Sequence, residues 1–242
     1  MALTPLLLLP GLMTDGRMWD PILHALSHER LVVIGQTHVA DNMADLAAAA
    51  VSNMPDGPFA VAGFSLGGYV ALELCRQARD RIAGLALIDT SAQADSAEAR
   101  QNRQRVIDGL VSGGSSFADA IAPFPEKLFH PAHADEPGLR RLLEGMARSV
   151  GEAGFVRQQK AAMDRQDRRD VLTALRCPAL VVCGREDKVT PPERAQEMAG
   201  LLPGDVELVL VPDAGHMTTL EQPAAVVAPF LRWLDKVDGA PA

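Results

Sequence analysis

Hydrophobic residues in this chain fall into short, mostly apolar runs that alternate with segments of helical spacing. Six such runs predict buried strands, at residues 6–9, 31–35, 59–63, 85–89, 179–184 and 206–211. Apolar residues at helical spacing predict helices at residues 19–26, 43–51, 69–78, 193–202 and 224–237. Continuously apolar strands alternating with helices are typical of a parallel sheet covered on both faces. We therefore expect an α/β fold with a doubly wound, mostly parallel sheet of about six strands.

The segment 94–175 interrupts this alternation. It has no strand-like run, is rich in Arg, Asp, Gln and Ala, and contains helix breakers at residues 113–116 and 123–125. This pattern predicts roughly three or four amphipathic helices that form a cap over the carboxyl edge of the sheet. The predicted organisation is a core of residues 1–93 and 176–242, with a helical cap of residues 94–175 inserted after the fourth strand.

Composition limits the class of protein more than its chemistry. A chain of 242 residues with 48% hydrophobic and 22% charged residues is typical of one globular α/β domain. The formal net charge of -8 argues against a nucleic-acid partner, because no basic stripe dominates the sequence. The cysteines Cys75, Cys177 and Cys183 have unrelated spacings, which predicts free thiols in a reducing compartment and no metal site.

No segment predicts export or membrane insertion. The apolar run near the N-terminus is short, has no basic residues before it and stops at Pro10-Gly11, unlike a signal peptide. No run approaches the roughly 20 residues that a membrane-spanning helix needs. We therefore expect a cytoplasmic protein without a membrane partner.

The sequence Gly63-Phe64-Ser65-Leu66-Gly67 joins the third predicted strand to the helix after it. A serine on so tight a turn has strained backbone angles and needs small neighbours at Gly63 and Gly67. The turn holds the serine hydroxyl at the positive N-terminal end of the helix. This geometry suits a nucleophile, so Ser65 is the candidate catalytic serine.

A serine nucleophile needs a base, and the base needs an acid to orient it. His216 is the candidate base, because it directly follows the last strand and an imidazole exchanges protons near neutral pH. Asp187 after the fifth strand and Asp89 at the end of the fourth strand compete for the role of the acid. We favour Asp187, which gives the chain order Ser, Asp, His, and Asp89 is the alternative.

Negative charge that develops on a substrate oxygen needs two main-chain amides as an oxyanion hole. Leu66 supplies one amide, directly after the candidate nucleophile. The loop after the first strand makes a sharp turn at Pro10-Gly11, and Leu12 is the candidate for the second amide, with Met13 as the alternative.

Four motifs occur in order along nearly the whole chain. They are Leu-Leu-Leu-Leu-Pro-Gly-Leu at residues 6–12, Gly-Phe-Ser-Leu-Gly-Gly at 63–68, Gly-Arg-Glu-Asp-Lys-Val-Thr-Pro at 184–191 and Ala-Gly-His-Met at 214–217, with Leu-Glu-Gln-Pro at 220–223. Together they resemble the α/β-hydrolase superfamily, and most of all its small bacterial esterases, the group of pimeloyl-carrier-protein methyl ester esterases and enol-lactonases. In two respects the chain departs from that pattern: Pro10 stands where the family usually has His before Gly11, and we expect the leading β-hairpin to be absent.

The function that follows is hydrolysis of a carboxylic ester with a small or medium acyl group, through an acyl-enzyme on Ser65. The expected partner is a small-molecule ester, with no cofactor and no metal. The sequence does not indicate whether the protein is a monomer or an oligomer. A thioesterase, a carbon–carbon bond hydrolase or lyase, and a non-catalytic ligand receptor are the alternatives. Arginine-rich stretches in the cap fit a solvated helix face or attraction of a carboxylate or carrier (Arg100, Arg103, Arg105, Arg140, Arg141, Arg165, Arg168 and Arg169).

Overall fold

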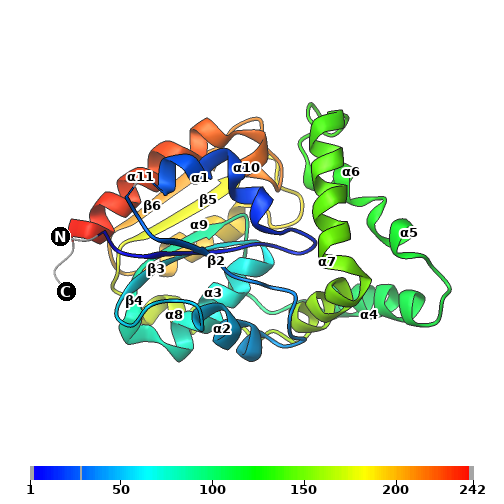
Figure 1. Cartoon of the computed structure of the whole chain (residues 1–242), viewed down its shortest axis with the longest axis horizontal. Coiled ribbons are helices and arrows are strands. Elements are labelled where there is room, and N and C mark those ends of the chain that lie inside the picture. The colour runs from blue at the N-terminus through cyan, green and yellow to red at the C-terminus, as the bar shows by residue number, and fades with distance from the viewer. Residues whose placement is uncertain (1–2, 28, 240–242) are drawn as a thin grey trace.

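The computed structural model describes residues 3–27 and 29–239, and its centre is a single sheet of six parallel strands. The strand order β2-β1-β3-β4-β5-β6 reverses direction between β1 and β3, which makes the sheet doubly wound as predicted. The reversal places the loops after β1 and β3 side by side at the carboxyl edge (Figure 1). The strands are β1 (Leu6–Leu9), β2 (Val32–Ile34), β3 (Phe59–Phe64), β4 (Ile82–Ile88), β5 (Ala179–Gly184) and β6 (Val206–Val211).

Two strands begin at other residues than the sequence predicts, β2 and β4. The strand β2 lies at the sheet edge and begins at Val32, leaving Leu31 52% exposed before it. The strand β4 begins at Ile82 rather than at residue 85. Gly84 hides this first part of β4 in the sequence, because it carries no apolar side chain; helix α11 (Pro223–Gly239) packs so close that a Cβ on Gly84 would lie 2.4 Å from Val237.

Helices cover both faces of the sheet because the side chains of each strand alternate between the faces. In β1, Leu7 and Leu9 join the apolar cluster on one face, and Leu6 and Leu8 join the cluster on the other. The first face is covered by α2 (Met43–Val51), α3 (Leu66–Gln77), α8 (Arg169–Ala174) and α9 (Pro192–Leu201), and the second by α1 (Asp20–Leu26) and α11.

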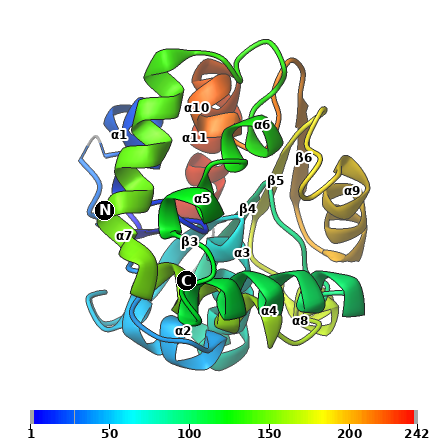
Figure 2. The same cartoon turned by 90° about the vertical axis from the view of Figure 1, so that its right-hand side faces the viewer.

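Between β4 and β5 the chain forms only helices in this fully described segment, as predicted for an insertion after the fourth strand. Figure 2 shows most of them as a layer in front of the sheet, beside the carboxyl ends of the strands. The longest one bends at Gly151, whose φ of 70° is available to a residue without a Cβ. The cap helices are α4 (Ala97–Val111), α5 (Phe117–Ile121), α6 (Phe124–Leu128) and α7 (Pro137–Met163).

Helix α8 follows the cap helices in the chain but packs on the first face of the sheet, where Val171 and Leu172 join the apolar cluster.

Within residues 3–27 and 29–239, no helix has both the length and the apolar character that crossing a membrane requires.

Candidate active site

Ser65 forms the turn between β3, which ends at Phe64, and α3. Its φ of 50° and ψ of -116° lie outside the usual regions for a residue with a side chain, a strain of roughly 1–3 kcal/mol. Two glycines make the turn sterically possible. A Cβ on Gly63 would lie 2.3 Å from the Gly67 carbonyl oxygen, and a Cβ on Gly67 would lie 2.1 Å from the Leu9 carbonyl oxygen. The turn thus has the strained geometry that the sequence predicts.

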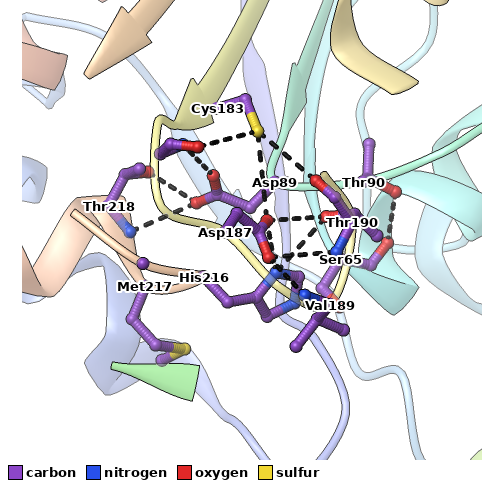
Figure 3. A network of polar contacts seen from close by, with 12 residues as sticks. Ser65, Asp89, Thr90, Cys183, Asp187, Val189, Thr190, His216, Met217 and Thr218 are labelled. Atoms are coloured by element: carbon purple, nitrogen blue, oxygen red, sulfur yellow. Dashed lines mark hydrogen bonds and ion pairs between the residues drawn. The ribbon is translucent and has the colours of Figure 1, made fainter. Parts of the chain in front are cut away.

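His216 lies in the loop after β6, and its ring faces the serine (Figure 3). The distance from His216 Nε2 to Ser65 Oγ is 2.9 Å. On its other side, Nδ1 lies 2.8 Å from Oδ2 of Asp187. A carboxylate only accepts hydrogen bonds, so Nδ1 carries the proton and Nε2 accepts the hydrogen bond from the serine hydroxyl.

Asp187 is fixed by the loop that follows β5. Its Oδ1 accepts hydrogen bonds from the amides of Val189 at 2.7 Å and Thr190 at 3.0 Å. Its Oδ2 accepts a further bond from the Thr190 hydroxyl at 2.8 Å, in addition to the one from His216. A carboxylate with this many donors is held in one orientation, which in turn fixes the orientation of the imidazole.

The charges of this buried site shift the pKa values of both partners. Burial alone would lower the pKa of His216, but the Asp187 charge and hydrogen bond, with smaller contributions from Asp89 and Glu221, raise it above its ordinary value. Burial alone would raise the pKa of Asp187, but the charge and hydrogen bond of His216 hold it below its ordinary value. The pair is therefore arranged to stabilise an imidazolium next to a carboxylate.

Asp89, the alternative acid, makes contacts of a different kind. Its Oδ1 accepts from the Gly184 amide at 2.9 Å, and its Oδ2 accepts from the Thr218 amide at 3.2 Å and the Thr218 hydroxyl at 2.6 Å. Burial and the nearby charge of Asp187 raise the pKa of Asp89. Asp89 therefore connects the beginning of the Asp187 loop to the end of the His216 loop without touching the imidazole nitrogens.

Cys183 completes a small polar cluster with the two aspartates, in which one ligand atom of each residue lies within 4.8 Å of the others. The oxygens of both aspartates already accept bonds from protein donors. Burial raises the pKa of the Cys183 thiol, which disfavours the thiolate form that binds metals. The cluster is better explained as a hydrogen-bonded network than as a metal site.

The two candidate oxyanion donors lie on the cavity beside Ser65. Within the described residues, neither the Leu12 amide nor the Leu66 amide donates to a protein acceptor. The Met13 amide, in contrast, donates to Oε1 of Gln158 at 3.0 Å. Of the two residues that the sequence left open, Leu12 is therefore the one with a free donor.

Gln158 was not predicted from the sequence. This residue of α7 is fully buried, and its Nε2 donates to the Gly11 carbonyl at 3.2 Å while its Oε1 accepts from Met13. The side chain thus holds the loop on both sides of Leu12. No local pattern marks such a residue, because the contact joins segments 145 positions apart. Thr190 had a local signal, since Asp187-x-x-Thr190 fits a turn in which the carboxylate caps the following amides.

A cavity of about 160 Å³ opens beside Ser65 and is mostly apolar. A second cavity of about 410 Å³ lies in the cap and shares two wall residues, Met13 and Phe124, with the first. The first cavity is lined by Leu12, Met13, Phe64, Ser65, Leu66, Tyr69, Arg103, Phe124, Lys127, Leu128, Ala162, Val189, His216 and Met217.

Many of the arginines of the predicted cap are engaged within the chain. Arg100, Arg105 and Arg141 are exposed, as a solvated helix face predicts, and Arg103 is the member of the set that lines the cavity beside Ser65. The ion pairs include Arg100–Asp164 at 3.0 Å, Arg103–Asp95 at 2.6 Å, Arg140–Asp135 at 3.0 Å, Arg168–Glu73 at 2.7 Å and Arg169–Asp167 at 2.6 Å.

Several known proteins with similar sequences or folds are named as esterases or lactonases. A pimeloyl-acyl-carrier-protein methyl ester esterase of Neisseria meningitidis serogroup C is 30% identical over 197 residues, which are 80% of this chain and 76% of that protein. A thermophilic esterase from Thermogutta terrifontis has a TM-score of 0.86 and 32% identity, covering 97% of this chain and 90% of its own. The enol-lactonase from Burkholderia xenovorans LB400 shares the fold, with a TM-score of 0.80, 23% identity, and coverage of 96% of this chain and 92% of its own.

The family described as the alpha/beta hydrolase family matches residues 6–229, which is most of the chain. Together with the esterases among its relatives, this match supports hydrolase activity. The chain therefore belongs to the alpha/beta hydrolase family.

Proposed function

We propose that the protein is a carboxylic ester hydrolase in which Ser65, His216 and Asp187 act as a catalytic triad. The observation that carries the proposal is the position of the His216 ring, 2.9 Å from Ser65 Oγ and 2.8 Å from Asp187 Oδ2 on its two nitrogens. Relatives named as esterases support the same reaction class.

In the first step, Ser65 Oγ attacks the ester carbonyl carbon while His216 Nε2 takes the hydroxyl proton. The carbonyl oxygen becomes an oxyanion, to which the Leu12 and Leu66 amides donate hydrogen bonds. The bond to the alkoxy oxygen then breaks, and His216 gives its proton to the leaving alcohol. In the second step, His216 takes a proton from water, and the resulting hydroxide attacks the acyl carbon. The bond from that carbon to Ser65 Oγ then breaks, His216 returns the proton to Oγ, and the acid is released.

The cavities support an ester with a small or medium acyl group. The apolar cavity of about 160 Å³ at Ser65 suits a short acyl group, which gains free energy by leaving water. A longer chain would continue past Met13 and Phe124 into the second cavity. Met13 and Phe124, which line both cavities, would change rotamer to admit such a chain.

The replacement Ser65→Ala tests the proposal. We expect turnover of p-nitrophenyl acetate and butyrate to fall about 10⁴-fold or more, with labelling by a fluorophosphonate lost and the fold retained. The control is Ser52→Ala, which removes an exposed hydroxyl at the end of α2. Retained turnover and labelling in Ser65→Ala would contradict the proposed nucleophile.

A panel of matched oxygen esters, acyl thioesters and lactones separates the proposed ester hydrolase from its alternatives. We expect the wild-type protein to turn over oxygen esters with the highest kcat/KM. Preference for acyl thioesters, or turnover of a β-diketone in the absence of ester hydrolysis, would instead indicate a thioesterase or a carbon–carbon bond hydrolase.

A further inference from the structure

The cap contacts the His216 loop directly, through the segment 128–133, which begins at the last residue of α6 and precedes α7. The main-chain amide of His216 donates to the Leu128 carbonyl at 2.6 Å. Gly215 lies so close to this segment that a Cβ there would be 2.7 Å from both the His130 nitrogen and the Leu128 carbonyl oxygen. The loop that carries the proposed base therefore rests against the cap backbone.

Glu221, in α10 (Thr218–Glu221), fixes the same loop from the core side. Its carboxylate is fully buried. The Oε1 atom accepts hydrogen bonds from the amides of Gly215 at 3.0 Å and Met217 at 3.1 Å. These two amides flank His216, so a single oxygen atom holds the backbone on both sides of the proposed base.

The second oxygen of Glu221 faces the cap. Oε2 accepts a hydrogen bond from the His130 amide at 2.7 Å, and it lies 3.1 Å from Nδ1 of His133. His133 is 19% exposed, so this pair lies at the edge of the junction. One buried carboxylate thus joins two segments that are about 90 positions apart in the chain.

We propose that Glu221 is a positioning residue that couples the seating of the cap segment 128–133 to the placement of His216 against Ser65. The proposal rests on the proposed function, because it assigns a role relative to the base of that reaction. In this proposal the cap segment 128–133 both lines the cavity, through Leu128, and holds the loop that carries His216.

A carboxylate suits this junction better than any neutral side chain. Four donors converge on its two oxygens, and a carboxylate offers acceptor sites only. A glutamine of the same shape has one acceptor oxygen, and its NH₂ group would face donors. The replacement Glu221→Gln therefore leaves buried donors unpaired on one side of the junction, with little change in volume.

We expect Glu221→Gln to lower kcat about 10- to 100-fold, with KM almost unchanged, because a small displacement of the base affects the chemical step more than substrate binding. The control is Glu207→Gln on β6, which removes a carboxylate that pairs with Arg232 of α11 and should keep wild-type kinetics. Hydrogen exchange should be faster in Glu221→Gln, and in this variant only, at the amides on the side that loses its acceptor: Gly215 and Met217, or His130.

The pH profile distinguishes positioning from simple loss of folded protein. Three carboxylates face His216: Asp187 from the loop after β5, Asp89 from the end of β4, and Glu221 from α10. Removing the Glu221 charge should move the acid limb of kcat/KM to lower pH. A decrease in the amount of folded protein alone would lower the rates at every pH without moving this limb.

His133→Ala tests the cap side and leaves the carboxylate in place. We expect a smaller loss in kcat, roughly threefold, and recovery in His133→Gln, which restores a donor. Wild-type kcat and an unmoved acid limb in Glu221→Gln would overturn the positioning role if Ser65→Ala is inactive. Retained activity in Ser65→Ala would instead overturn the proposed function on which the role depends.

Discussion

At the scale of single residues, Asp187 and Asp89 are both buried near His216 but have different hydrogen-bond donors. Asp187→Asn should lower kcat about 10⁴-fold, because an amide does not hold the Nδ1–H tautomer or stabilise the imidazolium. Asp89→Asn should cost much less, because Asp89 contacts Gly184 and Thr218 rather than the ring. Steady-state kinetics on p-nitrophenyl butyrate with both purified variants measures the two losses. Equal losses would contradict this division of roles.

The pKa of His216 also sets the pH dependence of the reaction. The proposed base works in its neutral form, so activity should rise as the pH increases through the raised pKa of His216. We therefore expect the acid limb of kcat/KM to lie above pH ~6.5 in the wild-type protein. Burial and the charge of Asp187 raise the pKa of Asp89 to about 8, so its carboxyl is mostly uncharged near pH 7. The acid limb should therefore stay in place in Asp89→Asn, and a move to lower pH would show that Asp89 carries a negative charge there.

At the scale of elements, we expect the helices α5 and α6 to decide which acyl chains fit. Ala122, which directly follows α5, is exposed and lines the second cavity. Ala122→Trp should lower kcat/KM for p-nitrophenyl octanoate about tenfold or more and leave the acetate unchanged, because only a long chain reaches this cavity. Ala153→Trp on α7 is the control, since within the described residues Ala153 is exposed and lines neither cavity. Equal losses on both esters would contradict the passage between the cavities.

The elements themselves could be predicted where burial is uniform. Residues 6–9 and 179–184 are recognisable as strands because they are buried on both faces and therefore apolar throughout. The sequence does not predict the first residues of β4, because Gly84 interrupts the apolar run there. This glycine makes room for α11, which is distant in the sequence. The number of cap helices was equally hard to predict, since short helices such as α5 depend on packing and capping more than on periodicity.

At the scale of the whole molecule, the residues placed at strand ends could be predicted and those that join distant segments could not. Ser65 and His216 follow strands whose carboxyl ends share one edge of the sheet, so topology alone suggests their approach. Gln158 and Glu221 act across the boundary between cap and core. Their partners are set by how the cap docks, which is a property of the folded chain. The contacts that the cap makes with the site can therefore be identified only from the folded structure.

The stability of the whole molecule should depend on one buried ion-pair group between α3 and the segment before α8. Glu73 is 3% exposed and is bound by Arg76 and Arg168, each at 2.7 Å. Burial alone would raise its pKa, but hydrogen bonds from Arg76, Gln77 and Arg168 lower it from 4.5 to about 2. A carboxyl with a lowered pKa stabilises the fold above its unfolded pKa, and this contribution is lost as the pH falls from 4.5 toward about 2.

Glu73→Gln should therefore lower the free energy of unfolding by about 1–3 kcal/mol at pH 7, because the donors of Arg76 and Arg168 lose a charged partner. The difference from the wild-type protein should shrink as the pH falls below 4.5, since the wild-type carboxyl then becomes protonated as the chain unfolds. Thermal unfolding between pH 3 and pH 8 measures this difference, with Glu193→Gln on the exposed face of α9 as the control. A difference that stays constant across this range would show that the charge of Glu73 does not stabilise the fold.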